Sequence, residues 1–403
     1  MKFSKRVTGM QSSPIRKLVP YAEAAKAEGK KIYHLNIGQP DIKTPIGFLD
    51  SIKKFAEDVI AYSTSHGSYE LIDAMIGYYK GYNMNFERKN IIVTNGGSEA
   101  LSFAFMAICD PEDEILVPEP FYANYNAFGS SVSVKMLPIT TKAEKGFHLP
   151  PKEEILKKIT SRTKGILLSN PGNPTGVIYT SEEMEMIADI AMEKELFIIA
   201  DEVYREFVYD GLKYTSFGNI VRVEDRVIIV DSISKRYSAC GARIGCIISK
   251  NDELMAQVMK LAQGRLCVPT LEQVGAVELY KTPASYLEEV NKEYQSRRDI
   301  LYSKLREMPG VICDEPKGAF YVVAKLPVDD AEKFVIWMLQ EFHVNKETVM
   351  MAPAEGFYAT PGLGKDEVRL AYVLKKEDLA KAMDILKAGL EAYPGRIKTA
   401  SNF

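Results

Sequence analysis

The chain has 403 residues, of which 46% are hydrophobic and 26% are charged, and its formal net charge is -3. At about 100–200 residues per domain, this length predicts two or three domains, and the composition is typical of a soluble globular protein. The small net charge gives no electrostatic reason to expect a nucleic acid or an anionic membrane as a partner. No apolar run reaches the roughly 18–20 residues that span a bilayer.

The cysteines and histidines give no indication of metal chemistry. The five cysteines are scattered and form no Cys-x-x-Cys pair, and the four histidines lack the spacing of metal ligands. We therefore expect no metal site, no disulfide framework and a reducing, cytoplasmic location. No apolar segment follows the basic residues of the first ten positions, so we expect no signal peptide.

Short apolar runs and helical patterns alternate through the middle of the chain, after a first helical segment at residues 21–31. Helical periodicity begins at Ser98 and again at Ser181, which we expect to be an N-cap. Continuous apolar strands between helices predict a mostly parallel sheet with helices on both faces. The predicted strands are 91–94, 114–117, 132–137, 165–168, 196–200, 227–230 and 244–248.

The last third of the chain has a different pattern. It contains long helical segments, strand-like runs and two later helices, in the order 252–280, 284–308, 319–324, 335–342, 368–373 and 379–390. We therefore expect an α/β protein with a large domain at residues 41–284 and a smaller α+β domain at 285–403. Residues 1–40 are predicted to form an arm and a helix that pack with the smaller domain.

Four stretches that carry polar or charged residues each lie near the end of a predicted strand, where ligands bind in open α/β sheets. The first, Asn95-Gly96-Gly97-Ser98, joins a strand to a helix. Its glycines and the free N–H groups of the helix start suit a phosphate, although an ordinary turn is the more common use. The second, residues 170–176 (Asn-Pro-Gly-Asn-Pro-Thr-Gly), is a rigid loop that is either a surface turn or a holder for an asparagine amide.

The other two stretches add charge. Asp201 closes the strand at 196–200, where a buried carboxylate needs a partner, although it is equally a candidate helix N-cap. Lys235 follows the strand at 227–230 and precedes Arg243; a partly desolvated lysine is a usable amine nucleophile, whereas most lysines are solvated. Each stretch alone has an ordinary structural explanation, and only the four together, in this order, predict a site.

In combination these motifs resemble the class I and II aminotransferases, which are fold type I pyridoxal-phosphate enzymes. The resemblance runs from Leu35-Asn-Ile-Gly-Gln-Pro-Asp41 to Val368-Arg-Leu370. Between these ends it includes residues 170–176, Asp201-Glu-Val-Tyr204 and Ser232-Ile-Ser-Lys235. It implies pyridoxal 5′-phosphate as the cofactor. It also implies that Lys235 carries the cofactor as a Schiff base and then moves a proton between the substrate and the cofactor.

The resemblance also implies roles for the other residues of the site. Asp201 would keep the pyridine nitrogen protonated, and Tyr204 would hydrogen-bond the phenolic oxygen, so that Lys235, Asp201 and Tyr204 form the catalytic set. The substrate-binding set would be Gly38, Asn173 and Arg369, with Arg369 on the α-carboxylate. The cofactor-binding set would be Gly96, Gly97, Ser98, Tyr122, Asn173, Asp201, Tyr204, Ser232, Lys235, Arg243 and Tyr62. Tyr62 would come from a neighbouring subunit, which implies a homodimer with shared active sites.

The implied reaction is ping-pong transamination, in which the amino group of an L-amino acid passes to a 2-oxo acid such as 2-oxoglutarate. Aspartate is the first choice of donor, because it is the commonest substrate of the family members that the chain resembles. A dicarboxylate needs a second cation. Arg265 is the first candidate, because it lies in the segment where some relatives supply such a cation from the neighbouring chain, and His66 and Arg236 are weaker ones. Without such a cation, an aromatic or other neutral amino acid is expected.

Two other functions remain as alternatives on the same scaffold. A carbon–sulfur β-lyase would use the same cofactor residues but release ammonia and pyruvate without a 2-oxo acid acceptor. A non-catalytic regulator that binds the cofactor is disfavoured, because we expect no room for a DNA-binding domain before Leu35 and the catalytic residues are present. Ala242, Tyr69 and Ile72 depart from the usual pattern of the family and leave the substrate preference open.

Overall fold

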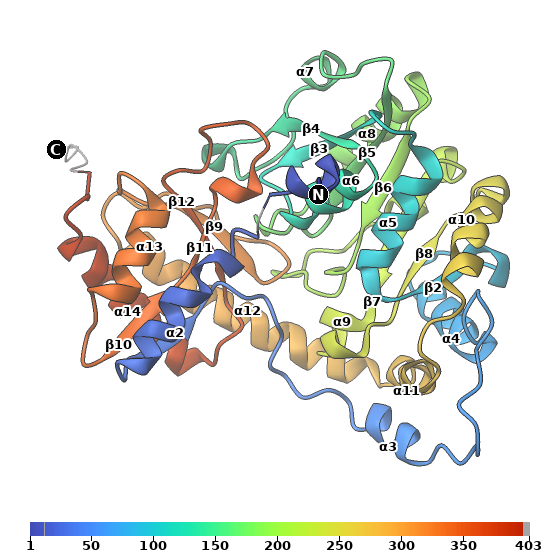
Figure 1. The fold of residues 1–403 in the computed structure, drawn as a ribbon, viewed down its shortest axis with the longest axis horizontal. Helices are drawn as coiled ribbons and strands as arrows, with labels where there is room; N and C mark the ends of the chain where they lie inside the picture. The colour runs from blue at the N-terminus through green and yellow to red at the C-terminus, as the bar shows by residue number, and fades with distance from the viewer. Residues whose placement is uncertain (12, 398–403) are drawn as a thin grey trace.

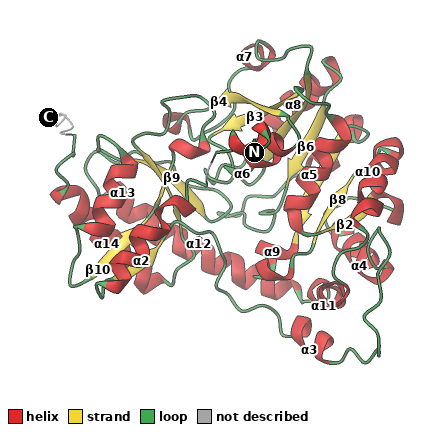
Figure 2. Ribbon diagram, viewed as in Figure 1, coloured by secondary structure: helices red, strands yellow, loops and turns green. Residues whose placement is uncertain are grey.

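The computed structural model describes residues 1–11 and 13–397, which form a large lobe and a small lobe side by side (Figure 1). The large lobe contains a seven-stranded sheet, and the small lobe contains a three-stranded sheet and a two-stranded sheet. Figure 2 shows the helices packed around these sheets. Among the described residues, none of the helices is both long enough and apolar enough to cross a membrane.

The sheet of the large lobe has the strand order β2-β8-β7-β6-β5-β3-β4. Neighbouring strands are parallel except at β8, which runs antiparallel to both β7 and β2. The predicted mostly parallel sheet is therefore confirmed. Its strands are β2 (Ile91–Thr94), β3 (Glu114–Glu119), β4 (Lys135–Thr140), β5 (Thr163–Ser169), β6 (Phe197–Asp201), β7 (Val227–Ser232) and β8 (Gly245–Ile248).

Helices cover both faces of this sheet, which explains why its central strands are apolar throughout. Successive side chains of a strand point to opposite faces, so Ile198 packs in the core that α4, α8 and α11 cover, and Ile199 packs in the core that α5 and α10 cover. The helices of the large lobe are α3 (Gly47–Lys53), α4 (Tyr69–Lys80), α5 (Gly96–Ile108), α6 (Asn124–Ser131), α7 (Lys152–Leu156), α8 (Ser181–Glu193), α9 (Ile233–Arg236), α10 (Asp252–Arg265) and α11 (Thr270–Tyr280).

The small lobe is built on the antiparallel sheet β11-β12-β9, beside a parallel pair of β1 and β10. Its strands are β1 (Lys31–His34), β9 (Tyr321–Lys325), β10 (Glu347–Met350), β11 (Ala352–Pro353) and β12 (Glu367–Ala371). Its helices are α2 (Val19–Ala27), α12 (Ala284–Arg306), α13 (Ala331–Gln340) and α14 (Lys376–Ala392), and the short α1 (Lys5–Thr8) lies against α6. Leu18, just before α2, and Ala22 within it share the small-lobe core with Val335 and Leu379.

Short 3-10 helices connect several elements. They are η1 (Arg16–Leu18), η2 (Arg88–Asn90), η3 (Ala143–Lys145), η4 (Phe217–Asn219), η5 (Val221–Val223), η6 (Cys240–Ala242) and η7 (Glu355–Phe357). The predicted domain boundaries after residues 40 and 284 stay predictions. The long helix α12 contributes Tyr294 and Leu301 to the small-lobe core, and Leu287 near its start packs against the large-lobe core.

Three of the predicted elements were wrong in their bounds. The helical segment at 252–280 is two helices, because Leu266 has a left-handed φ of 79° and Pro269 precedes α11. The helix predicted to end at residue 31 ends at Ala27, because Gly29 turns the chain with a φ of 81° into β1, a strand that was not predicted. The strand predicted at 132–137 lies at Lys135–Thr140, where it pairs with β3.

The N-cap of α8 was also predicted wrongly. Thr180, not Ser181, caps the helix: its hydroxyl accepts from the Glu183 N–H at 3.2 Å. In return the Glu183 carboxylate accepts from the Thr180 N–H at 2.7 Å. This reciprocal capping box satisfies two N–H groups, whereas a cap at Ser181 would place Glu183 too early to close it.

Candidate active site

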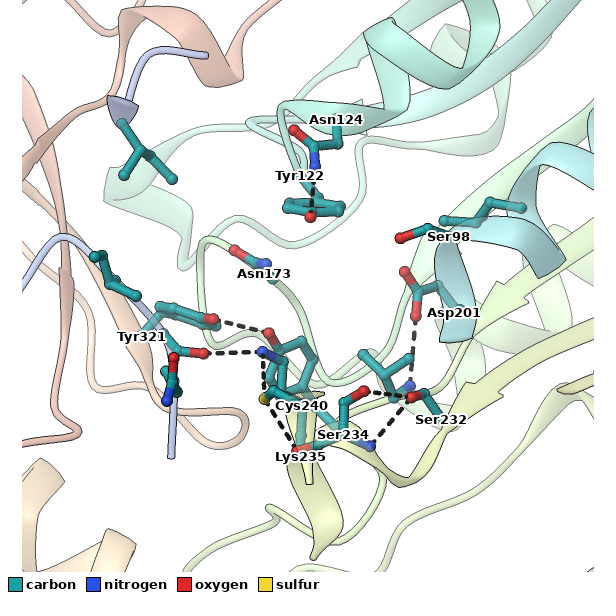
Figure 3. Close-up of a pocket in the computed structure, with 18 of the residues that line it drawn as sticks. Ser98, Tyr122, Asn124, Asn173, Asp201, Ser232, Ser234, Lys235, Cys240 and Tyr321 are labelled. Carbon is teal, nitrogen blue, oxygen red and sulfur yellow. Dashed lines mark hydrogen bonds between the residues drawn. The ribbon is translucent and has the colours of Figure 1, made fainter. Parts of the chain in front are cut away.

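A cavity of about 600 Å³ lies between the lobes, at the carboxyl ends of the strands β6 and β7. Residues that are far apart in the chain line it, from the N-terminal segment to β12, and Figure 3 shows several of them facing the same space. Of the site residues predicted from the sequence, those that line the cavity are Gly38, Gly97, Ser98, Tyr122, Asn173, Asp201, Tyr204, Ser232, Lys235, Arg243 and Arg369. Gly96 and Tyr62 do not line it.

Lys235 lies on the one-turn helix α9, which follows β7 directly. Ser232 caps this helix by accepting from the Ser234 N–H at 3.1 Å, so the backbone of the lysine is fixed. The Lys235 Nζ donates to the carbonyl oxygen of Gly38 at 2.9 Å and lies 3.7 Å from the Cys240 Sγ (Figure 3). It forms no salt bridge within the described residues, so its amine faces the cavity with neutral partners only.

Asp201 is the last residue of β6 and only 5% of its surface is exposed. One carboxylate oxygen accepts from the Tyr125 hydroxyl at 2.5 Å, and the other accepts from the Val203 N–H at 3.4 Å. Burial raises the pKa of this carboxyl to about 6, although both hydrogen bonds act in the opposite direction. No helix begins at Asp201, so the alternative of a helix N-cap was wrong; the carboxylate is placed to pair with a cation in the cavity.

The start of α5 and Arg243 form an anion site at one end of the cavity. Gly97 and Ser98 lie in the first turn of α5, where backbone N–H groups have no partner in the helix. Arg243 donates to the carbonyl oxygens of Cys240 at 3.0 Å and Asn95 at 3.3 Å, which holds its guanidinium beside this turn. Gly96 has a φ of 73°, and a Cβ there would collide with that guanidinium; glycine is therefore required for the close approach.

Arg369, at the centre of β12, is 2% exposed and has no carboxylate partner among the described residues. Its Nη2 donates to the Asn36 carbonyl oxygen at 2.6 Å, and its Nη1 donates to the Asn173 side-chain oxygen at 3.2 Å. Its Nε has no hydrogen-bond partner among the described residues. The guanidinium carbon lies 4.5 Å from the ring centre of Tyr321 and 5.0 Å from that of Phe357. A buried guanidinium with only neutral oxygens around it is a strong site for a ligand carboxylate.

Comparisons with known proteins agree with this geometry. A family model described as aminotransferase class I and II matches residues 30–386. The chain belongs to this family. It is 31% identical to the aspartate aminotransferase of Bacillus subtilis, over 98% of this chain and 100% of that protein. It is 32% identical to the probable aspartate/prephenate aminotransferase of Aquifex aeolicus, over 96% of this chain and 98% of that protein.

Solved structures of aminotransferases have the same fold. The aspartate aminotransferase from Thermotoga maritima matches 97% of this chain and 100% of its own with a TM-score of 0.88, at 29% identity. The alanine aminotransferase from Pyrococcus furiosus matches 96% of this chain and 99% of its own with a TM-score of 0.88, at 32% identity. The protein is thus a pyridoxal-phosphate-dependent aminotransferase of fold type I, and it acts on amino acid and 2-oxo acid substrates.

Three tyrosines of this aminotransferase complete the walls of the cavity. Tyr122 lines it and accepts a hydrogen bond from the Asn124 side chain at 2.7 Å. The Tyr204 hydroxyl shares a hydrogen bond of 2.8 Å with the Tyr321 hydroxyl. A Cβ on Gly38 would collide with that Tyr321 hydroxyl, so the glycine leaves room for the tyrosine pair.

Sequence reasoning missed several residues of the aminotransferase cavity. Tyr125 does not line the cavity but donates to Asp201 from behind it; it follows Tyr122 by three residues, and this helical spacing is the signal that identifies it. Some of the missed lining residues lie inside the quoted motifs at positions to which no role was given, namely Ile37, Gln39, Val203 and Ser234. The others belong to no motif and reach the cavity only through tertiary packing. They are Ser13, Ile15, Arg16, Leu101, Asn124, Val230, Cys240 and Tyr321.

None of the three cations that were considered for a distal carboxylate lines the cavity. Arg265 donates to the Val93 carbonyl oxygen at 3.0 Å, and its Nε is 3.4 Å from the Glu99 carboxylate. Arg236 is buried, with its Nη2 2.5 Å from the Asp231 carboxylate. Burial lowers the pKa of the His66 imidazole, so this ring is neutral near pH 7.

The residues that depart from the family pattern also lie away from the cavity lining. Ala242 is partly buried and packs against the core of the large lobe, and Ile72 is inside that core. Tyr69 is 47% exposed, and the Arg88 guanidinium lies over its ring at 4.9 Å. These substitutions therefore act on packing rather than on the surface that a substrate touches.

A buried carboxylate joins the two lobes by hydrogen bonds beside the cavity. Glu119, the last residue of β3, is completely buried, and its carboxylate accepts from the Ala359 N–H at 2.9 Å and the Thr360 N–H at 3.0 Å. The Thr360 hydroxyl also donates to it at 2.6 Å. The Phe121 N–H donates to the Phe357 carbonyl oxygen at 2.8 Å, so the strand end before Tyr122 is bound to the loop beside Arg369.

Proposed function

We propose that this aminotransferase moves the amino group of an L-amino acid, with aspartate as the first choice, to a 2-oxo acid such as 2-oxoglutarate. One observation carries the proposal: residues 36–38 hold both the amine and the carboxylate site. The Gly38 carbonyl oxygen accepts from Lys235, and the Asn36 carbonyl oxygen accepts from Arg369. An amino acid whose carboxylate lies on Arg369 therefore has its α-carbon on the side of the Lys235 amine.

The residues present fit pyridoxal phosphate. Gly97, Ser98, Ser232 and Arg243 would hold the phosphate, since a helix start beside a guanidinium favours a dianion. Asp201 would hold the ring nitrogen in its protonated form, because a buried carboxylate with a raised pKa gains most from a cationic partner. Asn173 and Tyr204 would bind the phenolic oxygen, and Tyr122 would lie on the ring.

Lys235 is the residue that transfers the proton. Pyridoxal phosphate, when bound, would delocalise the electron pair that remains on the substrate α-carbon when its proton is removed. The Lys235 amine takes the proton from the substrate and returns it on the cofactor side, which requires an amine without a fixed counter-ion. Arg369 and Asn173 keep the substrate oriented during the transfer, and the Tyr204–Tyr321 pair closes the cavity wall beside them.

The competing donors are distinguished by a half-reaction screen. Purified holoenzyme is mixed with single amino acids, and the loss of the visible absorbance band of the cofactor is followed. Conversion by aspartate supports the proposal, whereas conversion only by aromatic or branched amino acids overturns aspartate as the donor. Release of ammonia and pyruvate without any 2-oxo acid acceptor would instead identify a β-lyase.

We also propose a homodimer with shared active sites in a reducing, cytoplasmic compartment. Tyr62 is 80% exposed, and Val59 and Ile60, its near neighbours in the chain, are exposed as well, which suits contact with a second copy. All five cysteines are free, which suits a reducing compartment. Mixed dimers of Tyr62→Phe and Lys235→Ala subunits should regain one complete site if Tyr62 acts across the interface. No recovery of activity would place Tyr62 outside the partner's site.

A further inference from the structure

Arg16 lines the cavity, and the proposed reaction assigns no anionic partner to its guanidinium. The cationic side chains that line the cavity are Arg16, Lys235, Arg243 and Arg369. In the proposed function Arg243 faces the phosphate, Arg369 faces the α-carboxylate, and Lys235 holds the cofactor. We propose that Arg16 binds the side-chain carboxylate of an acidic substrate and so determines the preference for dicarboxylates. This assignment rests on the proposed function.

The backbone of Arg16 is fixed from both sides. Its N–H donates to the Ser13 carbonyl oxygen at 3.2 Å, as does the N–H of Lys17, which makes the turn at the start of η1. On one side Pro14 is buried against Gly356, where a Cβ would come within 2.5 Å of the proline. On the other side Leu18 is 1% exposed in the small-lobe core. The guanidinium is therefore presented from an anchored segment, which lowers the entropy that binding must overcome.

The anchored segment enters the cavity on the side of Arg369. Ile15 packs against the apolar cluster that contains Phe357 and Tyr358, and the Phe357 ring lies 5.0 Å from the Arg369 guanidinium carbon. Arg16 is the next residue along the chain, so both guanidiniums belong to the small-lobe side of the cavity. Two cations on one side of a cavity suit a substrate with two carboxylates.

Within the described residues, the chain supplies no counter-ion to Arg16. Its neighbour Lys17 is paired with Glu332, outside the cavity, whereas Arg16 forms no ion pair with any described residue. Asp201 is the one acidic residue of the described cavity lining, and it accepts from Tyr125 and faces the ring nitrogen in the proposed function. Arg265 and Arg236, by contrast, each face a carboxylate of their own chain. The anion for Arg16 must therefore come with the ligand.

The test compares the aspartate and alanine half-reactions of the Arg16→Gln holoenzyme. We expect kcat/KM for L-aspartate and L-glutamate to fall about 10- to 100-fold, the range for losing one hydrogen-bonded charge pair, while that for L-alanine changes by less than about twofold. Lys17→Gln is the matched control, because it removes a neighbouring cation that does not line the cavity. It should leave the ratio of aspartate to alanine activity unchanged.

Charge reversal gives the sharper form of the test. Arg16→Glu should lose aspartate activity and gain activity on amino acids with a basic side chain, such as L-lysine. The absorbance of the bound cofactor should stay as in the wild type, which shows that the cavity is still formed. A wild-type enzyme that converts no amino acid overturns the proposed function. A wild type that transaminates, with an aspartate-to-alanine ratio that is the same in Arg16→Gln, overturns the assignment of Arg16 alone.

Discussion

The charged groups differ between the two sides of the cavity: the large-lobe side carries the carboxylate of Asp201 as well as cations, whereas the charged groups of the described lining on the small-lobe side are cations only. Asp201 accepts from Tyr125, and Arg243 is held by two carbonyl oxygens at the start of α5. Arg369 has only neutral oxygens around it, and Arg16 has no ion pair among the described residues. We call these sides the cofactor half and the substrate half. The cofactor would bind to groups that the fold already holds in place, and the substrate would bind to cations that have no internal carboxylate in the described chain.

The contrast is clearest between two arginines of nearly equal burial. Arg236 is 1% exposed and Arg369 is 2% exposed. Arg236 has an internal counter-ion in Asp231, which also accepts from the Tyr79 hydroxyl at 2.7 Å. Arg369 has none in the described chain. Burial therefore does not separate a structural arginine from a binding one, whereas the presence of an internal carboxylate does.

The largest effect is expected in the cofactor half, from Lys235→Ala. Loss of the amine that binds the cofactor and moves the proton should lower multiple turnover by at least about 10⁴-fold and remove the visible absorbance of the holoenzyme. Absorbance spectra and steady-state assays check both. The control is Lys250→Ala, which removes a lysine that pairs with Glu224 at the surface of the same lobe. A Lys235→Ala enzyme with full activity would remove the lysine from the mechanism.

The two buried arginines should respond oppositely in stability. Arg236→Met leaves Asp231 without its buried partner and should lower the free energy of unfolding by about 3–5 kcal/mol. Arg369→Met removes a buried charge that has no internal partner, so the free energy of unfolding should be unchanged or higher, while kcat/KM falls for every amino acid. Urea unfolding of the apoenzymes measures the difference. Equal destabilisation by both changes would contradict the distinction between a structural arginine and a binding one.

The raised pKa of Asp201 predicts a pH-dependent stability of the apoenzyme. Between about pH 4 and 6 the unfolded chain releases this proton while the folded chain keeps it. The folded state therefore loses about 3 kcal/mol as the pH rises, and the loss is complete above pH 6. Asp201→Asn has no proton to release, so its stability relative to the wild type should increase by about 3 kcal/mol from pH 4 to 7. A difference that does not change with pH would remove the burial argument for this carboxylate.

The smallest effect is expected from Tyr125→Phe. Loss of its hydrogen bond should raise the pKa of Asp201 further and weaken its hold on the ring nitrogen, with a decrease in kcat of up to about tenfold. The pH dependence of the cofactor absorbance should shift as well, which a purely structural role would not cause. Tyr393→Phe removes a similar tyrosine hydrogen bond, to Asp329 at 3.0 Å in the small lobe, and should change neither property.

The sequence predicted those parts of the fold and the site that depend on local pattern. Apolar runs located the strand that ends at Asp201 and the strand that ends at Ser232, just before Lys235, because a sheet covered on both faces requires them. It missed β1, whose pairing with β10 joins segments more than three hundred residues apart, and it missed the break at Leu266. Arg16 and Tyr321 were not predicted because neither belongs to a motif, and only tertiary packing brings them to the cavity.

Glu119 couples the cofactor half of the cavity to the substrate half. Its hydrogen bonds bind the strand end before Tyr122 to the loop that places Phe357 beside Arg369. A ligand that orders either side should therefore favour the arrangement of the other, and thermodynamic reciprocity requires the two effects to be equal. An unreactive dicarboxylate should raise the equilibrium affinity of the enzyme for the cofactor by the same factor by which the cofactor tightens the dicarboxylate. The fraction of enzyme that retains its cofactor should therefore increase with the concentration of the dicarboxylate substrate.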